Sequence, residues 1–108
     1  MATEITVREL ARELENGRAV RLLDVRQPAE HQLVHLEGSV LIPLGELPQR
    51  AAEIANDPAT LLVVYCHHGV RSRTAANFLE QLGHANVRSL AGGIDAWSCE
   101  VDPAVRRY

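Results

Sequence analysis

The 108-residue chain contains no lysine, and its net charge of −3 comes from 14 acidic residues set against 11 arginines. Nucleic-acid binding usually needs a basic face, so we expect no nucleic-acid partner. No apolar run approaches the ~20 residues of a membrane span, and residues 1–6 lack the basic and apolar segments of a secretory signal. These absences predict a cytoplasmic protein without a membrane partner.

Cysteine is also scarce, and only Cys66 and Cys99 are present. Two thiols can form one disulfide, but a cytosolic setting keeps them reduced. Cys99 lies in a polar segment, where we expect it to have no role, the alternative being a resolving thiol. Cys66 is followed by His67 and His68, but adjacent ligands do not match the usual spacings of a zinc site. We therefore expect no metal.

Helical and strand patterns alternate along the chain. Thr6 and Glu9 have the spacing of a capping box, which predicts that a helix begins there. Strands separated by helices favour a mainly parallel sheet that is covered on both faces. We therefore expect one α/β domain over residues 1–108, with its core at about residues 5–97 and a short tail at residues 98–108. Helices are expected at residues 7–15, 28–33, about 47–55, about 72–82 and 94–97, and strands at residues 20–25, 40–42, 61–65 and 87–90.

The most apolar run of the chain is Leu61–Tyr65, and it is directly followed by Cys66. A short apolar run without alternation is typical of a central strand buried on both faces. Ligands of parallel α/β sheets bind beyond the carboxyl ends of the strands. Residues 66–72, which we name the cysteine loop, lie at such an end and therefore form the candidate site.

The residue types of the cysteine loop favour a reactive thiolate at Cys66. Backbone N–H groups of a strand-to-helix loop can form an anion-binding nest, and the helix N-terminus adds a partial positive charge. Arg71 adds a permanent charge, and Gly69 tolerates the positive φ of a tight loop. Such settings lower the pKa of a cysteine from about 8.5 into the range of roughly 3.5–7.5. The alternative is that Cys66 is an inert small hydrophobic residue.

The cysteine loop resembles the active-site loop of rhodanese-like sulfurtransferases, whose single-domain members often read Cys-x-x-Gly-x-Arg-Ser. Further segments resemble the signatures of the same family, and the likeness extends from about residue 5 to residue 97. The resemblance implies a rhodanese-like α/β fold with a mainly parallel five-stranded sheet and helices on both faces. The similar segments are residues 23–26 with Pro28 and Glu30, His35 with Gly38 and residues 42–44, and residues 86–97.

The resemblance also implies a reaction. Cys66 would accept sulfane sulfur from thiosulfate or a persulfide donor, with no cofactor other than the covalent persulfide. It would pass that sulfur to a thiophilic acceptor such as cyanide, a small thiol or a protein, as an enzyme of the thiosulfate:acceptor class. The residues implied to bind the anionic sulfur are those of the loop, namely His67, His68, Gly69, Val70, Arg71 and Ser72.

The role of Ser72 and the function of the whole chain stay open at this point. Ser72 acts either through its hydroxyl or as a helix cap. Asp24 and Arg26 are interpreted as structural residues near the site. The chain is alternatively a catalytically silent module that binds a partner, although the intact Cys66 and Arg71 argue against this. The third possibility is a thiolate-based phosphatase or arsenate reductase. Phosphatase relatives carry one more residue between these two positions, and the four residues found here favour a persulfide.

Overall fold

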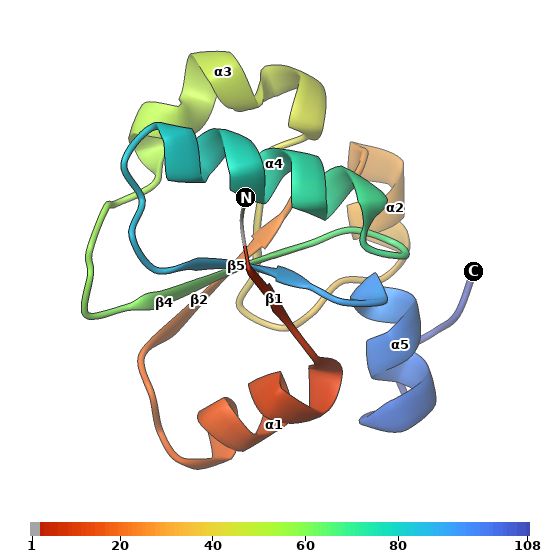
Figure 1. Cartoon of the computed structure of the whole chain (residues 1–108). Helices are drawn as coiled ribbons and strands as arrows, with labels where there is room; N and C mark the ends of the chain where they lie inside the picture. The colour runs from red at the N-terminus through yellow and green to blue at the C-terminus, as the bar shows by residue number, and fades with distance from the viewer. Residues whose placement is uncertain (1–2) are drawn as a thin grey trace.

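The computed structural model describes residues 3–108 and contains a five-stranded sheet with helices on both sides (Figure 1). The strands are β1 (Thr3–Ile5), β2 (Val20–Asp24), β3 (Val40–Leu41), β4 (Leu61–Tyr65) and β5 (Val87–Leu90). They follow the order β1-β5-β4-β2-β3, and every pair is parallel. The predicted α/β fold with a parallel five-stranded sheet is confirmed. None of the helices in the described residues is long and apolar enough to cross a bilayer.

Two apolar cores lie on opposite faces of the sheet, in agreement with the predicted helix layers. On one face, α3 (Leu47–Arg50) and α4 (Val70–Gln81) cover side chains such as Leu62 and Val64. On the other face, α1 (Val7–Glu15) and α5 (Gly93–Glu100) cover Val63 and Tyr65. Figure 1 shows these two pairs of helices above and below the sheet. All five residues of β4 are buried, as expected for the central strand.

Strand β1 and the helix expected at about residues 47–55 differ from the prediction. Strand β1 was not predicted, because three residues are too few to show a pattern and its partner Arg88 lies far along the chain. The helix expected at about residues 47–55 is shortened to α3, with a 3₁₀ turn before it at Leu44–Glu46 and another after it at Ala51–Glu53. Pro48 lies in the first turn of α3, where its missing N–H is tolerated, and it separates α3 from the turn before it. Helix α2 (Pro28–Leu33) agrees with the expected residues.

The cysteine loop is shorter than predicted, because α4 begins at Val70 rather than at Ser72. Gly69 precedes the helix with a φ of 106°, a conformation that glycine adopts without steric cost. Helix α5 likewise runs on to Glu100. The segment predicted as a tail packs back on the domain, since Val101 and Val105 contact the core beneath α1 and α5.

Candidate active site

Cys66 follows β4 directly, and its side chain is only 1% exposed. Its sulfur accepts hydrogen bonds from the backbone N–H of Gly69 at 3.1 Å and of Ser72 at 3.4 Å. The Ser72 hydroxyl lies 3.6 Å from the same sulfur and is held by Ser89 at 2.8 Å. Backbone donors that converge on one atom stabilise negative charge there. The geometry therefore has the form of the predicted nest.

The first residues of α5 donate backbone hydrogen bonds to the cysteine loop. The N–H of Ile94 donates to the carbonyl of Cys66 at 2.9 Å, and the N–H of Asp95 donates to that of His67 at 3.1 Å. Gly93 makes this approach possible, because a Cβ at that position would lie 2.4 Å from both loop carbonyl oxygens. Gly93 was not predicted as a site residue, although two adjacent glycines before a helix were the available signal.

Arg71 does not hydrogen-bond to the sulfur but forms a two-point ion pair with Glu30 of α2. The two nitrogen–oxygen distances are 2.7 Å and 3.0 Å. The hydrogen bonds from Arg71 hold the pKa of Glu30 down to about 2, and the carboxylate raises the pKa of Arg71 in return. The predicted stabilisation of bound sulfur by Arg71 thus involves a guanidinium that is already paired. Glu30 was noted in the sequence only as part of a signature.

Asp24 and Arg26 form a second ion pair, which is fully buried beside the first. Nε of Arg26 donates to Asp24 at 2.9 Å, and Nη2 donates to the other carboxylate oxygen at 2.7 Å. Nη2 also donates to the carbonyl of Val34 at 2.6 Å. A buried ion pair is tolerated when its remaining donors and acceptors are bonded. This geometry agrees with the structural role expected for the pair.

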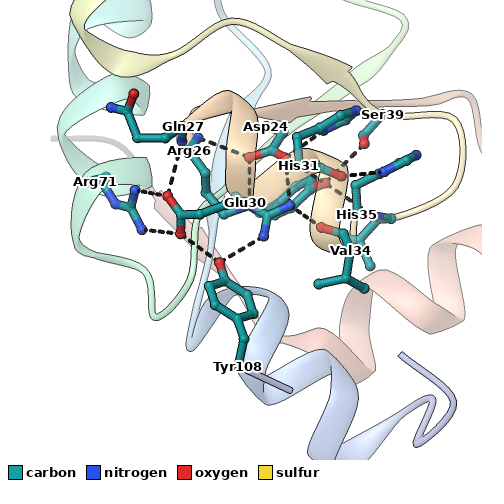
Figure 2. A network of polar contacts seen from close by, with 12 residues as sticks. Asp24, Arg26, Gln27, Glu30, His31, Val34, His35, Ser39, Arg71 and Tyr108 are labelled. Atoms are coloured by element: carbon teal, nitrogen blue, oxygen red, sulfur yellow. Dashed lines mark hydrogen bonds and ion pairs between the residues drawn. The ribbon is translucent and has the colours of Figure 1, made fainter. Parts of the chain in front are cut away.

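Tyr108 joins the two ion pairs, as Figure 2 shows. Its hydroxyl accepts a hydrogen bond from Nη1 of Arg26 at 2.8 Å and donates to Glu30 at 2.7 Å. Burial raises the pKa of Tyr108 to about 12, so the hydroxyl keeps its proton at neutral pH. Nothing in the sequence indicated this residue, because it lies in a polar segment without periodicity.

His67 and His68 lie in the cysteine loop as predicted, and their rings stack with centroids 3.9 Å apart. The Tyr108 ring covers His67 at the same centroid distance and with an angle of only 9° between the planes. Burial and the neighbouring His68 lower the pKa of His67. Val70, also predicted to line the site, is 73% exposed at the start of α4.

His67, His68 and Asp95 come close enough to form a possible metal-binding group, where the sequence predicted no metal. The two imidazole rings lie face to face, however, and the Asp95 carboxylate is paired with Arg107 at 2.9 Å. Ligands of a tetrahedral ion must direct their lone pairs to one point. Stacked rings do not do so, and this arrangement does not suit a shared ion.

Proteins similar in sequence to this chain include sulfurtransferases. The protein is 36% identical over 98 residues to a sulfurtransferase of Allochromatium vinosum, with 91% of this chain and 90% of that protein covered. It is 38% identical over 106 residues to MoeZ of Mycobacterium tuberculosis. That match covers 96% of this chain but only 26% of MoeZ, so this chain spans about a quarter of the length of that relative.

Solved structures show the same fold. A rhodanese-related protein of Thermoplasma volcanium superposes with a TM-score of 0.83 at 32% identity, covering 98% of this chain and 99% of that one. The human single-domain sulfurtransferase TSTD1 superposes with a TM-score of 0.79 at 27% identity, covering 93% and 98%. The family of the rhodanese-like domain matches residues 6–100. By this match, by its fold and by the arrangement around Cys66, the chain belongs to the rhodanese-like domain family.

Proposed function

We propose that this protein is a sulfurtransferase in which Cys66 carries sulfane sulfur as a persulfide. The observation that carries the proposal is the convergence of the Gly69 and Ser72 N–H groups on the Cys66 sulfur. Donors placed in advance around an atom stabilise the charge that develops there during reaction. The similarity to sulfurtransferases of the same length supports sulfur transfer in general.

The proposed reaction has two steps. In the first, the Cys66 thiolate attacks the sulfane sulfur of thiosulfate, a new S–S bond forms and sulfite leaves with the electron pair of the broken bond. With a persulfide donor, the leaving group is the donor thiolate. In the second step, cyanide, a small thiol or a protein thiol attacks the outer sulfur, and Cys66 leaves as thiolate. No metal or organic cofactor takes part in either step.

The charges around Cys66 bear on the choice between the two classes of donor. Thiosulfate is a dianion and would be drawn to Arg71, although Glu30 offsets much of that charge. A lowered pKa leaves His67 largely neutral at physiological pH and therefore a weak attractant. A persulfide donor, which carries less charge, depends less on these groups. We therefore include a persulfide donor and a protein acceptor in the proposal.

The experiment is intact-mass spectrometry after incubation with thiosulfate or a persulfide donor. A one-sulfur adduct should appear on the protein, disappear in Cys66→Ser and persist in Cys99→Ser, whose thiol is exposed. An adduct that survives Cys66→Ser would show that Cys66 is not the carrier. Complete lack of an adduct with every donor would favour the partner-binding module.

Phosphatase chemistry is the second reaction to test. Four residues separate Cys66 from Arg71, and α4 already begins at Val70, so the loop has little backbone left to surround a tetrahedral group. We expect no hydrolysis of aryl phosphates that depends on Cys66. Hydrolysis as fast as sulfur transfer, and lost in Cys66→Ser, would overturn the proposal in favour of a phosphatase.

A further inference from the structure

Tyr108 contacts one end of the cysteine loop directly and is linked to the other end through Glu30, although it lies outside every segment that resembles the family. Its ring stacks on His67, the residue directly after Cys66. Its hydroxyl bonds Glu30, which in turn holds Arg71 near the other end of the loop. Figure 2 shows the hydroxyl between the guanidinium of Arg26 and the carboxylate of Glu30.

The Tyr108 hydroxyl lies where one group must both accept a hydrogen bond and donate another. Arg26 is fully buried, and Nε and Nη2 already donate to Asp24, with Nη2 donating also to Val34. Its Nη1 is thus left to bond an acceptor, while the nearby oxygen of Glu30, which accepts from Arg71, can take a second donor. A hydroxyl meets both needs at once, because it accepts one hydrogen bond and donates another. A phenylalanine ring would fill the same space but would leave both groups without this link.

The Glu30 carboxylate links Tyr108 to Arg71, because it accepts hydrogen bonds from both. One of its oxygens accepts from the backbone N–H of Gln27 at 3.0 Å and from Arg71 at 2.7 Å. The other accepts from Arg71 at 3.0 Å and from the Tyr108 hydroxyl at 2.7 Å. The carboxylate plane is thus held from two sides. A guanidinium paired at two points must follow that plane, because the two groups are planar and matched in width.

We propose that Tyr108 is a positioning residue of the sulfur-transfer site, acting on His67 through its ring and on Arg71 through its hydroxyl and Glu30. The inference rests on the proposed function. The sulfur of Cys66 is held by the Gly69 and Ser72 N–H groups, neither of which Tyr108 bonds. Tyr108 therefore affects how an anionic donor is gathered near Arg71 more than how fast Cys66 attacks a bound donor.

The test measures the rate at which Cys66 gains sulfur as a function of thiosulfate concentration. Tyr108→Phe keeps the ring on His67 and removes only the hydroxyl. We expect its KM for thiosulfate to rise about tenfold, the scale of one hydrogen bond to a charged group, while the limiting rate stays within about twofold. Arg106→Ala, an exposed change in the same segment, is the matched control and should leave both parameters unaltered.

A double-variant cycle tests whether the Tyr108 hydroxyl acts on Arg71 through Glu30. If the hydroxyl acts through Glu30, Tyr108→Phe should change the KM less than about twofold when Glu30→Gln is already present. An unchanged KM in Tyr108→Phe, or an equal change with and without Glu30→Gln, would overturn the inference. A fall in the loaded fraction alone would indicate a merely structural role and would overturn it too. If the unaltered protein gains no sulfur at all, the proposed function itself fails, and that outcome is distinct from the others.

Discussion

The two sides of the site are held by different kinds of bond. Around Cys66 the contacts are mostly backbone hydrogen bonds: Gly69 and Ser72, which are close in sequence, donate to the sulfur, and the more distant start of α5 donates to the loop carbonyls. Around Arg71, charged side chains from distant segments meet, and Tyr108 completes their hydrogen bonds. The contacts to the sulfur follow from the local loop conformation, whereas a charged network survives only if all its members are present. Substitutions can therefore separate the two sides.

Arg26→Met breaks the network at its buried end and should have the largest effect on stability. The variant removes the guanidinium from the fully buried Asp24 carboxylate, which keeps only its hydrogen bonds with His31, Tyr65 and the backbone N–H of residue 26. Removing one member of a buried ion pair costs about 3–5 kcal/mol. Urea denaturation of Arg26→Met should show a loss of this size, and the double variant Asp24→Asn/Arg26→Met should recover part of it. A loss below about 1 kcal/mol would show that the pair contributes little.

Gly93→Ala breaks the backbone side instead. A Cβ there would lie 2.4 Å from the loop carbonyl oxygens, and the residue has a φ of 61°. Strain of this kind costs about 1–3 kcal/mol before the displaced loop is counted, so we expect a loss of about 3 kcal/mol in urea denaturation and slow sulfur loading. Gly17→Ala is the matched control, because its φ is 73° but nothing lies near the added Cβ. Equal losses in both variants would mean that the contact with the loop is unimportant.

Glu30→Gln loosens the network at its solvent-facing end, and its effect should depend on pH. The folded-state pKa of Glu30 is about 2, below the ordinary value of 4.5. The carboxylate therefore adds stability that is fully present above pH 4.5 and is lost as the pH falls towards 2. Because the side chain is partly exposed, we expect only about 1 kcal/mol at pH 7. The difference between the two proteins should shrink in urea denaturation at pH 3; a constant difference would contradict the assignment.

His67→Gln tests a residue that links the two sides of the site, because His67 belongs to the cysteine loop and also stacks on Tyr108. Burial lowers its pKa below the ordinary value of 6.5, so the ring is mostly uncharged at pH 7.5. We expect Gln to change thiosulfate loading by less than about twofold at that pH and to weaken it more as the pH falls, when the native ring gains charge. His68→Gln, at the exposed neighbouring ring, is the matched comparison. A large loss at pH 7.5 would mean that His67 acts without a charge.

Most of the fold and the centre of the site follow from short-range patterns. The apolar run Leu61–Tyr65 predicted the buried central strand, and Gly69 with the residues after it predicted the turn into a helix. Both depend on periodicity and on backbone conformations that neighbouring residues determine. Where the structure departs from the prediction, at β1 and around Pro48, the element is very short or interrupted. Such elements form mainly through contacts with the rest of the chain.

The sequence by itself determined that a lone cysteine stands between a buried strand and a glycine-led helix, and hence that backbone donors face its sulfur. It did not determine what Arg71 contacts. Glu30 lies 41 residues before Arg71, and Tyr108 lies 78 residues after Glu30. No local pattern links these positions, and their hydrogen bonds form only when the folded sheet and the returning segment after α5 bring them together. Tertiary structure alone therefore decided which side chains surround the cysteine loop.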